Sequence, residues 1–143
     1  MRLLLDVNVW VALFDDAHVH SNVANGLLMR PNIKIATCPM VENAVIRILN
    51  LPSYGRIGPF GLERVRTQLK RVCAEFDHVF WADNISLRDD AHVNFARVSG
   101  HNQITDLYLL ALATAHGACL ASFDQGVALS AVPTATTANF MLL

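Results

Sequence analysis

The chain begins Met1-Arg2-Leu3-Leu4-Leu5-Asp6-Val7-Asn8-Val9-Trp10, in which a short apolar run ends at an acid. A continuous apolar run of this kind, closed by a polar residue, is typical of a buried strand in a parallel sheet. A helix is predicted soon after it, over roughly Val9–Phe14. The chain therefore opens with a strand–helix unit that places Asp6 at the carboxyl end of the strand.

Strands and helices are predicted to alternate along the rest of the chain. Further strands are predicted at Ile33–Thr37, Val79–Trp81, Cys119–Ala121 and around Thr134–Thr137. The predicted helices are Ser21–Met29, Pro39–Leu49, Leu62–Phe76, Asp90–Val98 and Ile104–His116, and the Pro- and Gly-rich stretch Leu51–Gly61 is predicted as a loop. This alternation predicts an α/β fold, a three-layer α/β/α domain with a central, mainly parallel sheet of four to five strands.

The predicted helix Ile104–His116 differs from the others because it is apolar on almost every face. A helix of that composition is expected to be buried against the sheet rather than exposed along one side. Gly117 follows it directly and suits the C-terminal cap, where a left-handed backbone conformation is common.

The length and composition of the chain limit its class. With 143 residues it is expected to form one domain, spanning residues 1–143. Hydrophobic residues make up 53% and charged residues 16%, which indicates a dense core and an apolar face covered in a homodimer. The net charge of −1 argues against a protein that binds nucleic acid by general phosphate contact, and leaves open a nuclease with a local basic face and a divalent metal in its site.

The compartment is predicted from what the sequence does and does not contain. Its apolar runs are far shorter than the roughly 20 residues needed to cross a bilayer, and the first is too short for a signal peptide. The three cysteines, Cys38, Cys73 and Cys119, are odd in number and far apart. They are expected to be reduced thiols, so a cytoplasmic location without a membrane is predicted.

Acids occur where predicted elements start or end, and the four are Asp6, Glu42, Asp106 and Asp124. Two of them follow strands, and two lie in the first turn of a helix. Ligands of parallel α/β sheets bind outside the carboxyl ends of the strands, so separate segments can bring these carboxylates to one cleft. Taken alone, each acid is equally well explained as a cap or loop residue, and Asp106 also suits the positive end of a helix dipole.

Clustered carboxylates point to a cation. They repel one another, and this raises their pKa values unless a positive ion neutralises them. Mg²⁺ and Mn²⁺ are hard ions that prefer carboxylate and water ligands. The pattern therefore predicts a divalent metal site, and no Ser–His–Asp order or activated cysteine is evident beside it.

These acids lie in segments that resemble the motifs of one family. The segments are Asp6–Leu13, Pro39–Asn43, Gln103–Ala113 and Leu120–Asp124. In order and spacing they resemble PIN-domain ribonucleases, specifically the VapC-type toxins of bacterial toxin–antitoxin pairs. The resemblance covers nearly the whole chain. Ser122 stands where the family more often has Thr, and no acid of the pattern is missing.

The resemblance implies an activity and partners. It implies a Mg²⁺-dependent endoribonuclease toxin, with Mn²⁺ as a substitute metal, that is dimeric and is held inactive by a cognate VapB-type antitoxin. The expected reaction is hydrolysis of an RNA phosphodiester bond by a water that the metal makes nucleophilic. The identity of the RNA target and of the antitoxin does not follow from the resemblance.

The resemblance also implies roles for single residues. The implied catalytic set is Asp6, Glu42, Asp106 and Asp124. Three of them are expected to surround the metal, and Glu42 completes the cluster directly or through water. The implied polar neighbours, which orient carboxylates or water, are Asn8, Thr105 and Ser122. Ordinary capping explains each of these neighbours equally well.

Other features carry weaker predictions. His18 and His20 form an i, i+2 pair that suits either a metal or phosphate contact or, more simply, a polar loop, and His101 suits proton transfer or a plain loop position. The basic residues Arg64, Arg66, Lys70 and Arg71 suit RNA contact, antitoxin docking or a solvated helix face. Trp10 and Trp81 are assigned to the core or a dimer interface rather than to base stacking.

Two rival functions remain open from the sequence. A receiver-like signalling domain would need a late lysine, and the only lysines are Lys34 and Lys70. A non-catalytic PIN-like module that binds RNA or protein would be marked by a lost acid, and none is lost. The nuclease is therefore the preferred hypothesis.

Overall fold

The structure, a computed structural model, describes residues 1–55 and 58–143. Its strands are β1 (Arg2–Leu5), β2 (Lys34–Thr37), β3 (Asp77–Phe80), β4 (Cys119–Ser122) and β5 (Phe140–Leu142). Its α-helices are α1 (Val7–Phe14), α2 (Ser21–Leu28), α3 (Pro39–Ile48), α4 (Leu62–Glu75) and α5 (Ile104–Ala115). The loop predicted over Leu51–Gly61 includes residues 56 and 57, which lie outside the described residues.

The strands form one sheet in the order β3-β2-β1-β4-β5, and every neighbouring pair is parallel. All five carboxyl ends therefore lie at the same edge of the sheet. The chain builds the sheet outward from β1 on one side with β2 and β3, and on the other side with β4 and β5. The crevice between β1 and β4 is thus the topological switch point, where ligands of such sheets bind.

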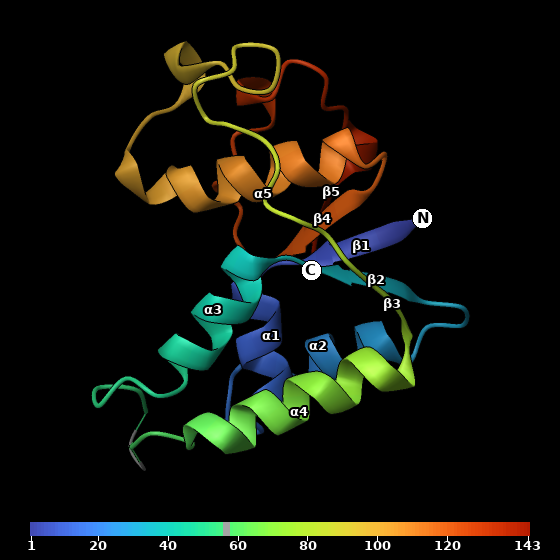
Figure 1. The fold of residues 1–143 in the computed structure, drawn as a ribbon, viewed down its shortest axis with the longest axis vertical. Coiled ribbons are helices and arrows are strands. Elements are labelled where there is room, and N and C mark those ends of the chain that lie inside the picture. Colours follow the sequence, from blue (N-terminus) through green and yellow to red (C-terminus); the bar gives the residue numbers. More distant parts are fainter. Residues whose placement is uncertain (56–57) are drawn as a thin grey trace.

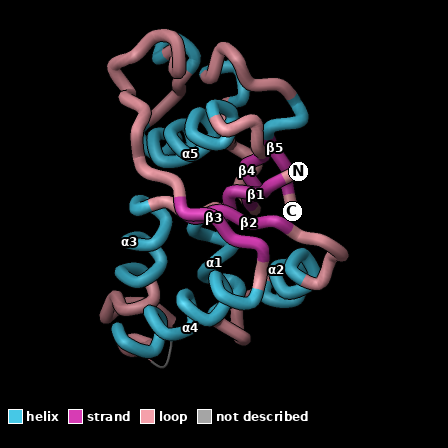
Figure 2. The backbone as a smooth tube through the Cα atoms, turned by 45° about the vertical axis from the view of Figure 1, so that its right-hand side comes forward, coloured by secondary structure: helices cyan, strands magenta, loops and turns pink. Residues whose placement is uncertain are grey.

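Helices cover both faces of this sheet (Figure 1). Helix α5 packs against β4 and β1 on one face, and α1 to α4 form the layer on the other. The tube view, turned from that of Figure 1, shows the same three layers and the strands gathered between them (Figure 2). The predicted three-layer α/β/α fold with a parallel sheet is confirmed.

Apolar side chains of β1 and α5 fill the centre of the sandwich. Leu4 and Leu5 are fully buried, and every residue of Leu107–Ala113 is buried in α5. The prediction of an all-round buried helix is confirmed. Gly117 adopts a φ of +61° just after α5, as the predicted C-terminal cap requires. None of the described helices is long and apolar enough to span a membrane.

The predicted helix Asp90–Val98 is wrong. This segment forms turns and a single 3₁₀ turn, Phe95–Arg97. Short polar side chains capture the backbone donors: Asp89 accepts from the N–H of Ala91, and Asn94 accepts from the N–H of Ala96. Such local bonds compete with helix formation.

The last predicted strand, Thr134–Thr137, is also misplaced, because the strand is Phe140–Leu142. Thr136 and Asn139 form a reciprocal capping box around a 3₁₀ turn, and this consumes the segment that was expected to be extended. Strand β3 begins two residues before the predicted Val79, because Asp77 already pairs with Lys34 of β2.

Candidate active site

Asp6 lies at the switch point, immediately after β1. Its backbone N–H donates to the carbonyl of Ala121 in β4, and its side chain caps α1 by accepting from the N–H of Val7 at 2.6 Å. The residue is only 3% exposed. Burial raises the pKa of its carboxyl, an effect that the hydrogen bonds from Ser122 and Val7 oppose. The carboxylate is therefore held in one orientation at a site where its charge is costly.

Ser122, at the end of β4, connects the residues around Asp6. Its hydroxyl donates to Asp6 Oδ2 at 2.6 Å and accepts from Asn8 Nδ2 at 3.0 Å and from the backbone N–H of Asp124 at 3.0 Å. Asn8 Oδ1 in turn accepts from the N–H of Phe123 at 3.3 Å. This buried network ties the ends of β1 and β4 together and orients two of the predicted acids.

Asp106 joins this group from the first turn of α5. Burial, the charges of Asp6 and Asp124, and a hydrogen bond with Asp124 raise the pKa of Asp106 to about 7. Asp124 itself is exposed, and its Oδ1 accepts from the N–H of Gly126 at 2.6 Å. The structure thus brings together three of the four predicted acids, contributed by β1, α5 and the segment after β4.

Glu42 lies in the first turn of α3, as predicted, but its side chain belongs to a different group. Its Oε1 accepts from the Thr37 hydroxyl at 2.7 Å, and the same hydroxyl lies 2.8 Å from His78 Nε2. Since the Thr37 proton is directed to Glu42, the His78 ring is the donor to Thr37. Glu42 is not among the charges that shift the pKa of Asp6 or Asp106.

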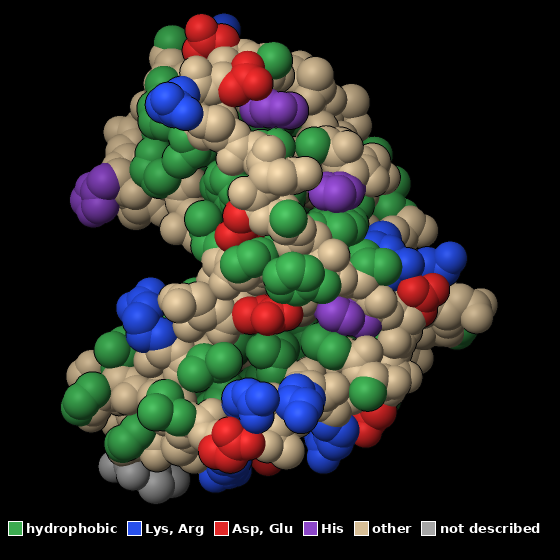
Figure 3. Space-filling model, in the orientation of Figure 1, with side chains coloured by type: hydrophobic (Ala, Val, Ile, Leu, Met, Phe, Trp, Pro, Cys, Tyr) green, Lys and Arg blue, Asp and Glu red, His purple; other side chains and the backbone are tan. Residues whose placement is uncertain are grey.

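A cleft of about 370 Å³ opens beside the acids. Its lining residues are Asp6, Val7, Asn8, Val11, His18, Ala44, Arg47, Ile48, Thr105 and Asp106. Figure 3 shows the surface deeply hollowed on its left side, between the part of the molecule that contains α5 and the part that contains α3. The wall formed by α3 presents Ala44, Arg47 and Ile48 rather than Glu42, which points to another side of the helix.

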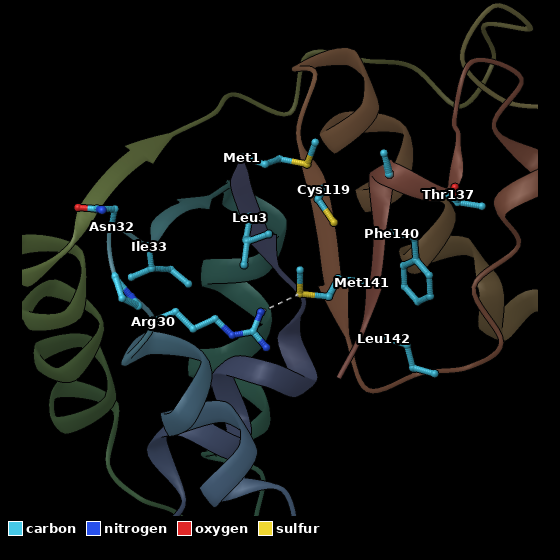
Figure 4. A pocket seen from close by; sticks show the side chains of 12 residues that line it. Met1, Leu3, Arg30, Asn32, Ile33, Cys119, Thr137, Phe140, Met141 and Leu142 are labelled. Carbon is cyan, nitrogen blue, oxygen red and sulfur yellow. Dashed lines mark hydrogen bonds between the residues drawn. The ribbon is translucent and has the colours of Figure 1, made fainter.

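A larger hollow, about 580 Å³, lies elsewhere and lacks suitable chemistry. Figure 4 shows Leu3, Cys119 and Met141 of three neighbouring strands beside it, with the Arg30 guanidinium directed at the Met141 sulfur, 3.7 Å away. No acid or histidine lines it. Size therefore does not locate the site here, and the smaller cleft with its carboxylates is the candidate active site.

The remaining predicted residues are dispersed. Thr105 lines the cleft, but no hydrogen bond of its side chain is found within residues 1–55 and 58–143. His20 stacks on Phe123 with 4.3 Å between ring centroids, whereas His101 is exposed in a 3₁₀ turn before α5 and does not line the cleft. Trp10 is fully buried, as predicted for a core residue, and Trp81 stacks on His116 with 4.1 Å between ring centroids.

Three of the four basic residues of α4 have local partners. Arg66 pairs with Glu63, Arg71 pairs with Glu75, and the Arg64 guanidinium lies 5.4 Å from the centroid of the Phe60 ring. None of them lines the cleft. This arrangement agrees with the solvated helix face that was one of the alternatives for these residues.

Sequence reasoning missed Arg47, which lines the cleft, and Asp83, which caps α3. Arg47 lines the cleft from α3. A signal was available, because position 47 lies one helical turn after Ala44. Asp83 was also missed: its Oδ2 accepts from the N–H of Met40 at 3.0 Å and so caps α3. No sequence signal connects residues 43 positions apart.

Comparison with known proteins decides the family. The model of the PIN domain family matches residues 3–133. This chain is a member of the PIN-domain family. Within the family, Ribonuclease VapC44 of Mycobacterium tuberculosis is 35% identical over 144 residues, which covers 100% of both chains. Ribonuclease VapC29 of the same organism is 37% identical over 128 residues, 90% of each chain. The predicted resemblance to VapC proteins is confirmed.

Solved PIN-domain structures support the fold. VapBC2 from Rickettsia felis, bound to a DNA fragment from its promoter, matches with a TM-score of 0.62 at 16% identity and covers 100% of this chain and 99% of that chain. VapC20 of Mycobacterium tuberculosis, a toxin that cleaves the sarcin–ricin loop, matches with a TM-score of 0.57 at 14% identity and covers 85% of this chain and 87% of that chain. At these identities the matches show that the PIN-domain fold is shared.

Proposed function

We propose that this chain is the toxin of a toxin–antitoxin pair and acts as a metal-dependent endoribonuclease. The observation that carries the proposal is the convergence of Asp6, Asp106 and Asp124 at the switch point of a PIN-domain sheet, with the pKa of Asp106 raised to about 7 by burial and by the other two charges. The VapC relatives named as ribonucleases support the same reaction.

The donor set fits a hard divalent cation. In the described residues, no three acidic, histidine or cysteine side chains already surround one point, so the cluster is not a closed metal cage. Mg²⁺ is usually held by one or two carboxylates, several waters and substrate phosphates, and an incomplete set of this kind is what it needs. Asp6, Asp106 and Asp124 would hold the ion, and Mn²⁺ would substitute for it.

A bound Mg²⁺ would supply Lewis-acid chemistry, which activates water and neutralises charge on the phosphate. The residues of the chain hold the ligands in place and shape the cleft. Ser122 and the N–H of Val7 hold Asp6 in one orientation. Asp106, whose pKa burial and the neighbouring charges raise to about 7, would be held ionised by the cation and would bind it together with Asp6. Asn8 orients Ser122, and Thr105 stands at the mouth of the cleft.

Glu42 enters this proposal indirectly. Its hydrogen bond to Thr37 and its absence from the charges acting on Asp106 favour an action through water over direct binding of the ion. The Thr37 hydroxyl, itself bonded to the His78 ring, holds Glu42 at the carboxyl end of β2. The cleft wall facing Asp106 is then formed by Arg47 rather than by a fourth carboxylate.

Cleavage of RNA by the purified chain tests the function. A structured RNA pool is expected to be cut with Mg²⁺ or Mn²⁺ present and to stay intact with EDTA, and 5′-end mapping is expected to give discrete sites. Asp6→Asn, prepared in parallel, controls for contaminating nucleases because Asn keeps an oxygen that can cap α1. Cleavage that persists in EDTA, or an Asp6→Asn sample as active as the wild type, would reject the metal-dependent assignment.

We also propose a homodimer that a VapB-type antitoxin neutralises, in the cytoplasm. Large apolar side chains are exposed on the described surface: Met1, Val19, Val23, Met29, Phe80 and Leu142. These side chains are available to be covered in an interface, and the VapBC2 neighbour is a complex by its name. The free thiols Cys38, Cys73 and Cys119 agree with a reducing compartment. Light scattering of the purified chain is expected to give twice the monomer mass, and a monomer mass would contradict the dimer.

A further inference from the structure

Arg47 shares the cleft with two of the acids and has no ion-pair partner among the residues that the structure describes. It projects from the last turn of α3 and lines the cleft together with Asp6 and Asp106. The residue is exposed, and within residues 1–55 and 58–143 it forms no ion pair with a carboxylate. A guanidinium that is neither buried nor paired does little for the fold, because even paired surface charges contribute little.

His18 presents a second donor to the same cleft. Its Nδ1 accepts a hydrogen bond from the backbone N–H of His20 at 3.1 Å, which assigns the proton of the neutral ring to Nε2. The ring lines the cleft beside Asp6 and Asn8. The local turn therefore holds one edge of the imidazole and leaves the Nε2–H free to donate.

The charges in the cleft explain why such donors are needed. Asp6 and Asp106 repel an anionic phosphodiester, and Asp124 adds a third negative charge beside them. Among the described residues that line the cleft, Arg47 is the only lysine or arginine. A guanidinium presents a planar fork of donors that matches two phosphate oxygens, and a neutral imidazole N–H supplies one further bond.

We propose that Arg47 and His18 form a phosphate-binding subsite for the RNA backbone in the same cleft as the carboxylates. Arg47 would grip one phosphodiester group of the substrate, and His18 would donate Nε2–H to the same group or its neighbour. The subsite rests on the proposed function, because it orients the RNA backbone toward Asp6 and Asp106. Both residues contact substrate and position it, and neither takes part in proton transfer.

Binding without cleavage tests the subsite separately from the nuclease activity. In the Asp106→Asn background, fluorescence anisotropy measures the affinity for a labelled single-stranded RNA at several salt concentrations. Adding Arg47→Gln is expected to weaken binding by about tenfold or more and to reduce the salt slope by about 0.7, the value for one lost phosphate contact. Arg47→Lys is expected to keep the slope but to lose part of the affinity, because it keeps the charge and loses the fork.

His18→Asn removes the Nε2–H donor but keeps the hydrogen bond within the local turn. The Asn side-chain oxygen can accept the N–H of His20 as Nδ1 does, but it leaves no donor at the position of Nε2. Binding is expected to weaken by about threefold to tenfold with little change in salt slope. Circular dichroism melting curves are expected to match those of the parent protein, since neither side chain is buried.

Arg66→Gln is the matched control, because Arg66 is exposed on α4, pairs with Glu63 and does not line the cleft. It is expected to leave the affinity and salt slope nearly unchanged. An Arg47→Gln protein that behaves like Arg66→Gln, or a parent protein that binds no RNA, would overturn the subsite. If the wild-type protein does not cleave RNA, the proposed function is rejected instead. The subsite is tested by binding and the function by cleavage, so the two failures are distinguishable.

Discussion

Asp106→Asn is expected to slow RNA cleavage by about a thousandfold or more. The substitution removes a carboxylate that lies with Asp6 and Asp124 at the switch point and that is proposed to hold the metal ion. The ion's water activation and charge stabilisation are worth several kcal/mol, and about 4 kcal/mol corresponds to a thousandfold in rate. Single-turnover cleavage of a mapped RNA site, measured with Mg²⁺ in excess, gives the rate.

Asp90→Asn is the control for this change, because Asp90 is exposed and does not line the cleft. It is expected to cleave at the wild-type rate. An Asp106→Asn enzyme that retained even a tenth of the wild-type rate would show that Asp106 belongs to the fold and not to the reaction.

The same substitution is expected to stabilise the metal-free protein at neutral pH. The pKa of Asp106 rises from an ordinary 3.8 to about 7 in the folded state, so the folded state binds more protons than the unfolded state between these values. Stability therefore falls as the pH rises through this window, and the cost is fully present above it. Asn carries no charge and avoids that cost.

Urea unfolding across this pH range separates the two effects of Asp106→Asn. Without metal, the variant is expected to be more stable than the wild type by on the order of 1 kcal/mol above about pH 7, after allowance for solvent screening, with the difference vanishing near about pH 4. Added Mg²⁺ is expected to stabilise the wild type more than the variant, because binding to the folded state adds stability. A variant destabilised at every pH would contradict the repulsion inferred for the acids.

Trp10→Ala is expected to have the largest effect on stability, about 3–5 kcal/mol of the free energy of unfolding. Trp10 is fully buried in α1 and meets Phe14 edge-on with 5.6 Å between ring centroids. Its removal leaves a cavity at the junction of α1 with the sheet, which the surrounding backbone cannot close completely. Chemical denaturation of the purified variant gives the change, provided that the slope with denaturant matches the wild type.

Trp10→Phe distinguishes lost volume from lost polarity. The indole Nε1–H has no hydrogen-bond partner in the part of the chain that the structure describes, so removing it sacrifices no bond. The change keeps most of the ring and is expected to cost less than about 1.5 kcal/mol. Equal losses for Trp10→Phe and Trp10→Ala would mean that shape, not volume, determines the packing at this position.

Much of the fold could be predicted because its signals are local. An apolar run that ends at Asp6, a proline that begins α3, and a helix apolar on every face each reflect burial that the residues themselves require. Alternation of strands with helices then implies a parallel sheet, and a parallel sheet places all carboxyl ends at one edge. The positions of Asp6 and Asp124 at that edge follow from this reasoning alone.

The predictions that were wrong concern competition between local and tertiary hydrogen bonds. The segment Asp90–Val98 has a composition compatible with a helix, but Asp89 and Asn94 capture backbone donors within turns. In addition, the N–H of Asn94 donates to the carbonyl of Ala131, a residue far along the chain. No helix periodicity reports a bond of that kind, so the segment could not be predicted correctly from its own sequence.

The sequence by itself determined that Asp6, Glu42, Asp106 and Asp124 lie at the starts and ends of elements, because hydrophobic periodicity defines where buried elements begin and end. Only the tertiary structure decided which of them meet. The rotation of α3 about its axis depends on packing against α1 and α4 and on the cap from Asp83, and this rotation directs Glu42 to Thr37 and Arg47 to the cleft. A side chain's direction on a packed helix is a property of its neighbours, and those neighbours are distant in the chain.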